Sequence, residues 1–258
     1  KSLPLINLVK RQIMRGNIME NILKKINLVF AAAIIIIMLV SIFLNLTRTA
    51  ETIDAAGERK IEKIKILIDP GHGGIDQGAS GDMKIAEAPI NLAISEKLMS
   101  FLEGSGFEVE MTRYDDTGLY TELSGTIRAK KNEDLKNRVE LINNSHADLV
   151  ISIHLNSFPQ KQYYGAHVFY QKNNEVTTKL AADTIQESMK TILDKSNGRV
   201  PQIKKDIKIM DDTRLPVILI ECGFLSNNEE ERKLISDDYQ EKTAWAVYTG
   251  IITFFNEL

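Results

Sequence analysis

Two histidines and one glutamate stand at the ends of short apolar runs, where side chains that do chemistry are often placed. His72 follows the run 64–68 in the turn DPGHGG, His154 follows the run 149–153, and Glu221 follows the run 217–220. Short, β-branched runs closed by turn residues predict buried strands. Because ligands bind beyond the carboxyl ends of strands in open α/β sheets, these side chains are expected to share one site.

The turn around His72 can bring its backbone close to a ligand. Pro70 cannot continue the hydrogen bonding of a strand, and Gly71, Gly73 and Gly74 permit a sharp turn. Histidine in such a turn is a candidate metal ligand or catalytic base.

Two histidines combined with carboxylates suggest zinc, since two histidines and one glutamate are a common ligand set of catalytic zinc sites. Glu87, which stands in the loop before a helix opened by Pro89, and Glu221 are the two candidates for the third ligand. The other glutamate is then expected to act as the base on the attacking water. Spacing alone leaves open which glutamate has which role.

Four ordered segments carry a family resemblance. They are 69–74 (DPGHGG), 87–92 (EAPINL), 152–157 (SIHLNS) and 220–227 (IECGFLSN). Over about residues 62–258 the chain resembles the zinc-dependent N-acetylmuramoyl-L-alanine amidases of the third amidase family, and in particular the short, membrane-anchored spore cortex type.

The resemblance implies that His72, Glu87 and His154 hold one Zn²⁺ per chain and that Glu221 is the catalytic carboxylate. It implies hydrolysis of the amide between N-acetylmuramic acid and L-alanine in peptidoglycan. For the spore cortex type it further implies removal of stem peptides during cortex maturation, which precedes formation of the muramic δ-lactam needed for germination. One departure is Ala88-Pro89, where family members often carry a charged pair.

Other interpretations stay open from the residues alone. The same zinc chemistry would serve a carboxypeptidase-like hydrolase that cuts within the stem peptide, and a non-catalytic wall-binding protein is a third reading. Asn156 is a candidate substrate contact at the lip of the pocket. Arg138 is a candidate either for substrate contact or for structural pairing with a buried acid such as Glu221. His167 is expected to face solvent.

The N-terminal region predicts a membrane anchor. Residues 28–44 carry no charge, and with their flanks they approach the ~20 residues that span a bilayer. Lysines 24 and 25 precede this run, which places the catalytic part outside the cytoplasm. The alternative is a cleaved signal and a secreted enzyme.

The expected organisation has four segments. They are a basic segment 1–25 (with 1–18 as a leader or upstream extension before Met19), an anchor or signal 26–46, a linker 47–62 and a catalytic domain 63–258. Beyond residue 48 there are 25 basic and 34 acidic residues, a net charge of −9, which argues against nucleic acid as a partner. The resemblance implies peptidoglycan as the substrate, and an activating protein partner is compatible with the absence of an evident wall-binding segment.

Strand-like and helix-like patterns alternate along the catalytic domain. They predict a single α/β domain with a twisted, largely parallel mixed sheet flanked by helices and preceded by an N-terminal transmembrane helix. The expected strands are 64–68, 107–112, 149–153, 166–170, 207–209 and 217–220. The expected helices are 89–102, 132–144, 175–194 and 239–256, and residues 115–131 are expected to form a surface loop.

Overall fold

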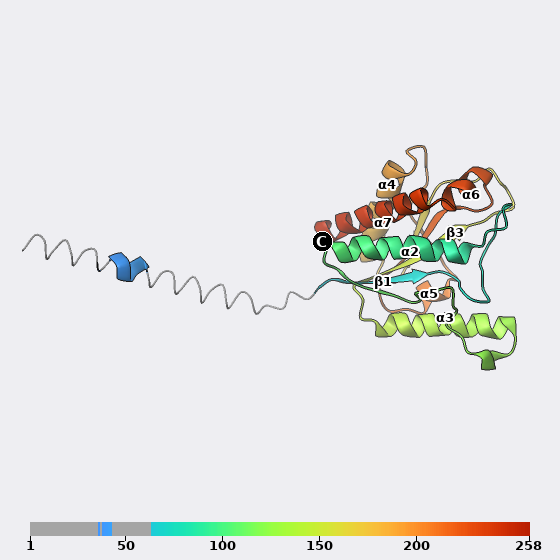
Figure 1. Cartoon of the computed structure of the whole chain (residues 1–258), viewed down its shortest axis with the longest axis horizontal. Coiled ribbons are helices and arrows are strands. Elements are labelled where there is room, and N and C mark those ends of the chain that lie inside the picture. Colours follow the sequence, from blue (N-terminus) through green and yellow to red (C-terminus); the bar gives the residue numbers. More distant parts are fainter. Residues whose placement is uncertain (1–35, 37, 43–62) are drawn as a thin grey trace, which may run out of the picture. The chain divides into compact units, whose positions relative to one another are not determined.

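The computed structural model describes residues 36, 38–42 and 63–258 of the chain (Figure 1). The chain divides into two units, Lys1–Glu62 and Lys63–Leu258, and the described strands all lie in the second unit. Apart from six helical residues, the predicted N-terminal segment, anchor and linker lie outside the described residues. None of the helices in the described ranges is long and apolar enough to cross a membrane.

A six-stranded sheet forms the centre of the second unit. Its strands are β1 (Lys65–Pro70), β2 (Glu108–Met111), β3 (Leu149–Asn156), β4 (His167–Tyr170), β5 (Gln202–Ile203) and β6 (Val217–Phe224). Their order in space is β2-β1-β3-β6-β4-β5. The first four of these are parallel, whereas β4 runs antiparallel to β6 and parallel to β5. The predicted α/β class with a largely parallel mixed sheet is confirmed.

Helices cover both faces of the sheet. They are α2 (Glu87–Gly104), α3 (Ile127–Asn144), α4 (Glu175–Ile192), α5 (Lys208–Asp211), α6 (Asn228–Leu234) and α7 (Asp237–Glu257). The long helices α2, α4 and α7 lie on one face, and α3 and α5 lie on the other (Figure 1). An apolar core fills each of the two interfaces between helices and sheet.

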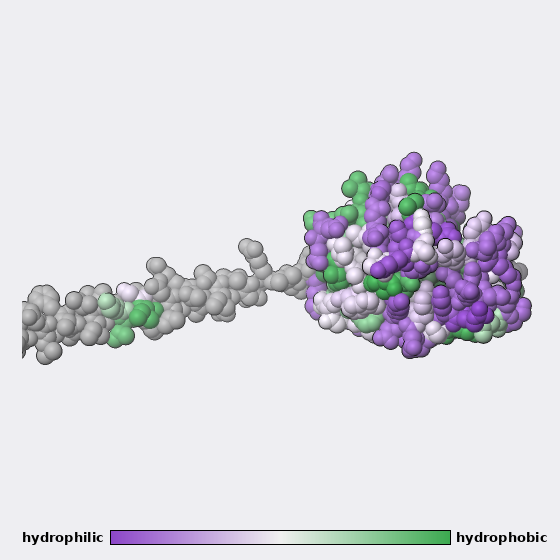
Figure 2. All heavy atoms as spheres, turned by 90° about the horizontal axis from the view of Figure 1, so that it is seen from above, coloured by the Kyte–Doolittle hydropathy of each residue, from purple (hydrophilic) through white to green (hydrophobic). Residues whose placement is uncertain are grey.

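The central strands β3 and β6 explain why the apolar runs of the sequence are continuous rather than alternating. Every residue of β6 is buried, because helices cover both faces of the sheet. The outer surface seen in Figure 2 is mainly hydrophilic with scattered apolar spots, as expected once the apolar side chains have been withdrawn into the two cores.

Two predicted elements need correction, and one helix was missed. The strand expected at 207–209 is wrong, since these residues lead into the short helix α5 and the strand of this region is β5. Helix α3 begins at Ile127 instead of 132, so it takes up the end of the expected surface loop. Thr126 caps it by accepting a hydrogen bond from the backbone N–H of Ala129. Helix α6 was not predicted, although Asn227 caps it in the same way.

The topology brings the predicted site residues to one edge. Strands β1, β3 and β6 are adjacent and parallel, so their carboxyl ends meet there. His154 and Glu221 are register partners on β3 and β6 and therefore project from the same face of the sheet. Helix α2 begins at this edge with Glu87, whose backbone N–H donates to Ala79 in the loop after β1.

Candidate active site

His72, Glu87 and His154 form one cluster, as the sequence predicted. One ligand-type atom from each lies within 4.8 Å of the others. Oε1 of Glu87 is 3.3 Å from Nε2 of His72 and 3.1 Å from Nδ1 of His154. The two imidazole rings meet edge to face with their centroids 4.9 Å apart. Three side chains from distant parts of the chain thus converge around a single small space.

His72 is held by its own loop. Its backbone has φ of +63°, a left-handed conformation that the flanking glycines help the turn to reach. Nδ1 lies 3.1 Å from a carboxylate oxygen of Asp76, which leaves Nε2 directed at Glu87. Burial would lower the pKa of His72, but the hydrogen bonds to Asp76 and Glu87 outweigh burial and raise that pKa to about 9.

Glu87 is almost completely buried, and backbone donors fix both of its oxygens. Oε2 accepts from the N–H of Ala79 at 2.9 Å, and Oε1 accepts from the N–H of Leu155 at 2.9 Å. Burial would raise the pKa of Glu87, but hydrogen bonds to His154 and His72 hold it below its ordinary range. The carboxylate is therefore ionised and preoriented toward the two imidazoles.

Two glycines leave the space that this cluster occupies. A Cβ atom added to Gly71 would lie 2.2 Å from Cε1 of the His154 ring. At Gly78, where φ is +70°, it would lie 2.6 Å from Oε2 of Glu87 and 2.8 Å from Cδ2 of His72. Both positions require glycine because the backbone passes directly against the clustered side chains.

Glu221 lies beside the cluster, on the strand next to His154. Its side chain is 10% exposed, and Oε1 accepts a hydrogen bond from Nζ of Lys204 at 2.9 Å. The other oxygen, Oε2, is buried and accepts no hydrogen bond from the described residues. Sequence reasoning missed Lys204, because it follows a two-residue strand that no local pattern marks.

Arg138 is only 1% exposed, and each nitrogen of its guanidinium group donates a hydrogen bond. It pairs with Asp69 and Asp134, each at 2.6 Å, and donates to the backbone carbonyl of His72. A substrate contact for Arg138 is not compatible with this burial, and its acid partners are not Glu221. Its arrangement supports the structural alternative, in which it holds the His72 loop against α3.

The remaining predicted residues lie nearby. Asn156 is partly exposed at the end of β3, and its side-chain oxygen accepts from the N–H of Ser157, so a substrate contact stays a prediction. The expectation that His167 faces solvent is wrong. His167 is buried opposite Glu221 on β4, and its Nε2 lies 2.9 Å from the carbonyl of Val200.

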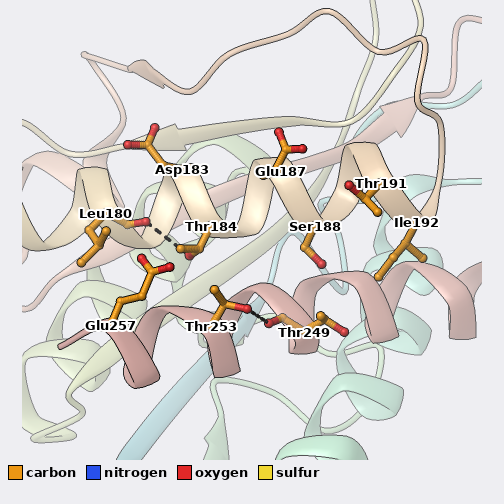
Figure 3. A pocket seen from close by; sticks show the side chains of 10 residues that line it. All are labelled: Leu180, Asp183, Thr184, Glu187, Ser188, Thr191, Ile192, Thr249, Thr253 and Glu257. Atoms are coloured by element: carbon orange, nitrogen blue, oxygen red, sulfur yellow. Dashed lines mark hydrogen bonds between the residues drawn. The ribbon is translucent and has the colours of Figure 1, made fainter.

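A separate cavity of about 430 Å³ lies between α4 and α7, away from this cluster (Figure 3). Several of its hydroxyls already donate to backbone carbonyls: Thr184 to Leu180 and Ala181, Thr249 to Trp245, and Thr253 to Thr249. A binding site needs convergent polar groups that are free to meet a ligand. We therefore place the chemistry at the sheet edge and not in this cavity.

The donor set at the sheet edge fits a zinc ion. Two imidazoles and one carboxylate are a common set for catalytic zinc, and here they share one space with a further carboxylate beside it. Glu87 also has the backbone hydrogen bonds that typically orient a metal-binding carboxylate. The fold and this cluster together define an α/β domain with a candidate hydrolase-type metal site.

Comparison with known proteins gives the family. The family model of N-acetylmuramoyl-L-alanine amidases matches residues 66–253, so the chain belongs to this family and is an N-acetylmuramoyl-L-alanine amidase. The chain is 39% identical over 192 residues to the germination-specific N-acetylmuramoyl-L-alanine amidase of Bacillus subtilis, covering 74% of this chain and 80% of that protein.

Solved structures agree. The CwlD amidase of Clostridioides difficile, solved in complex with the GerS lipoprotein, is 46% identical with a TM-score of 0.74, over 76% of this chain and 100% of that chain. An N-acetylmuramoyl-L-alanine amidase of Clostridium difficile 630 is 31% identical with a TM-score of 0.66, over 75% of this chain and 97% of that chain. The chain is therefore CwlD-like within its family.

Proposed function

We propose that this amidase uses one zinc ion held by His72, Glu87 and His154, with Glu221 as its catalytic base. The observation that carries the proposal is the convergence of these three ligand-type side chains beside a carboxylate with one uncommitted oxygen. When bound, zinc polarises the amide carbonyl and makes the attacking water more acidic.

The protein side of the reaction follows from the contacts of Glu221. Its carboxylate takes the proton of the attacking water and passes it to the leaving nitrogen of L-alanine as the amide breaks. The products are a muramic acid with a free lactyl carboxylate and an intact stem peptide. His72 and Glu87 stay fixed by Asp76 and by backbone N–H groups throughout.

Digestion of purified muropeptides by the full chain tests this proposal. Mass spectrometry should show intact stem peptides, loss of activity on chelation of zinc, and recovery when zinc is returned. Glu221→Gln should lower turnover by about 10²- to 10⁴-fold, the usual contribution of a general base. Full activity of this variant would remove Glu221 from its role, and products cut within the stem peptide would favour the carboxypeptidase-like alternative.

We further propose that the enzyme removes stem peptides during spore cortex maturation. Similarity to a germination-specific amidase and to a CwlD amidase supports this role. Cortex treated with the enzyme should gain muramic acid residues that lack L-alanine, the chemical precursor of muramic δ-lactam. Activity on vegetative peptidoglycan together with no activity on cortex would contradict this role.

A protein activator and an anchored position complete the proposal. The structural relative was solved with a lipoprotein, which supports an activating partner of that kind for this chain. The uncharged run 28–44 behind two lysines supports a membrane anchor with the catalytic domain outside the cytoplasm. Fractionation of cells that express the full chain should place it in the membrane, whereas release into the medium would indicate a cleaved signal.

A further inference from the structure

Lys204 reaches Glu221 from beside β5, the outermost strand of the sheet. It follows β5 directly, and β4 lies between β5 and β6. Its Nζ nevertheless lies 2.9 Å from Oε1 of Glu221, so the side chain crosses the face of β4 to reach the site. Its backbone N–H is anchored behind it, 3.4 Å from the carbonyl of Tyr170.

Phe169 fixes the path of that side chain. Nζ of Lys204 lies 4.4 Å from the centre of the Phe169 ring, within range of a cation–π interaction. Phe169 is the register partner of Leu219, two residues before Glu221, so the ring lies on the same face as the carboxylate. An exposed lysine loses side-chain entropy when it forms an ion pair. Here a ring and a carboxylate together define the position of the ammonium group.

Neither register partner of Glu221 holds its carboxylate in place. Its register partners His154 and His167 are bonded elsewhere, to Glu87 and to the carbonyl of Val200. The carboxylate therefore has one oxygen held by Lys204 and one, Oε2, that accepts no hydrogen bond from the described residues. A buried acceptor without a partner is costly, so its persistence points to a group that the protein does not supply.

We infer that Lys204 is a positioning residue for the reaction: by holding Oε1 it fixes the carboxylate plane and reserves Oε2 of Glu221 for the proton of the attacking water. The inference rests on the proposed role of Glu221 as base. It assigns Lys204 no contact with substrate. A base that can rotate about its last bond spends less time in reactive geometry, and small misplacements of reacting groups lower rates strongly.

Lys204→Met tests the inference, with Lys205→Met as the matched control. Lys205 is exposed and adjacent, so the control makes the same change of charge and type. Lys204→Met should lower kcat by roughly 10- to 100-fold, leave KM within about twofold, and leave the zinc content unchanged. Lys204→Arg should restore part of kcat, because it keeps a donor, and Lys205→Met should match the wild type. A Lys204→Met enzyme with wild-type kcat would overturn the inference.

A double-mutant cycle separates this inference from the proposed function. In a Glu221→Gln background, Lys204→Met should cause no further loss of turnover, because Lys204 acts through the carboxylate. A further tenfold loss there would show that Lys204 acts on substrate and would overturn the inference. High activity of Glu221→Gln alone would instead overturn the role of Glu221.

Thermal unfolding of the zinc-free proteins supplies a readout that does not depend on turnover. Lys204→Met leaves a mostly buried carboxylate without its partner, so it should lower Tm more than Lys205→Met does. Glu221→Gln should abolish that difference. Equal Tm values for the two lysine variants would show that the ion pair does not hold Glu221 in solution.

Discussion

Asp69 and Glu221 are two buried carboxylates on the same face of the sheet, and their bonding differs sharply. Asp69 accepts from Thr112 at 2.7 Å, from Arg138 at 2.6 Å and from Ser152 at 2.8 Å. Glu221 accepts from Lys204 alone, and its second oxygen accepts nothing from the described residues. Both oxygens of Asp69 accept hydrogen bonds, so we call it the saturated carboxylate. Only one oxygen of Glu221 accepts a hydrogen bond from the described residues, so we call it the open carboxylate.

This difference distinguishes a carboxylate that stabilises the fold from one that can accept a proton in the reaction. A buried carboxylate that has all its partners is fixed and unreactive, and Asp69 uses Arg138 to tie β1 to α3 beneath the His72 loop. A carboxylate with an unused acceptor can take a proton. The predictions below would break or sharpen this contrast, and they run from the largest expected effect to the smallest.

Breaking the saturated network should cost most stability. Arg138→Met leaves Asp69 buried without its cationic partner, so the free energy of unfolding should fall by about 3–5 kcal/mol. Urea unfolding of the zinc-free protein measures this. Adding Asp69→Asn to the same protein should recover part of the loss, and a loss below about 1 kcal/mol would show that the pair is not structural.

Substitution of Gly78, where the backbone passes close to Glu87 and His72, should have the next largest effect on the free energy of unfolding. Gly78 and Gly125 have almost the same φ, +70° and +69°, but a Cβ at Gly125 would meet nothing within 4 Å. Gly125→Ala should therefore cost only the backbone strain of its positive φ, about 1–3 kcal/mol. Gly78→Ala should cost a further ~1–3 kcal/mol from crowding against Glu87 and His72, and zinc affinity should fall with it. Equal effects of the two variants would contradict the packing described here.

The cluster could be predicted from the sequence because each of its residues follows a recognisable local signal. His72 and His154 end apolar runs, and Glu87 lies two residues before Pro89, which predicted the start of a helix; the observed helix begins at Glu87 itself. Parallel strands bring such ends together whatever the loops between them do.

Lys204 and His167 could not be placed in the same way. The contact of Lys204 with Glu221 depends on a two-residue strand and on a side chain that crosses Phe169, neither of which has a local signature. His167 occupies an alternating strand, and its burial is decided by the antiparallel pairing of β4 with β6. The apolar residues Ile207 and Ile209 suggested a strand, whereas tertiary packing makes this region a turn of helix.

Acid should weaken the hydrogen bonds of Asp69 only below the ordinary pKa range of a carboxyl group. Burial would raise the pKa of Asp69, but the charge of Arg138 and the hydroxyl of Thr112 hold it below its ordinary value of 3.8. The stability that this shift contributes is present above pH about 4 and is lost as pH falls through the pKa of the folded state. The stability advantage of zinc-free wild type over Asp69→Asn should therefore be constant from pH 7 to 5 and shrink below pH 4. An advantage that grows on acidification would have the wrong sign.

The smallest expected effect is on stability when the open carboxylate is neutralised. Glu221→Gln removes one partly exposed ion pair and also removes a charged buried acceptor, so unfolding free energy should change by less than about 1 kcal/mol. Urea unfolding beside Arg138→Met gives the direct comparison. A loss as large as that of Arg138→Met would mean that Glu221 is as structural as Asp69.

The zinc content of the purified full chain and two of its variants tests the central claim most directly. Elemental analysis should find one zinc per chain in the wild type and in Glu221→Gln, and far less than one in Glu87→Ala. This result would assign the two glutamates their different roles. Stoichiometric zinc in Glu87→Ala, or its loss in Glu221→Gln, would contradict the account.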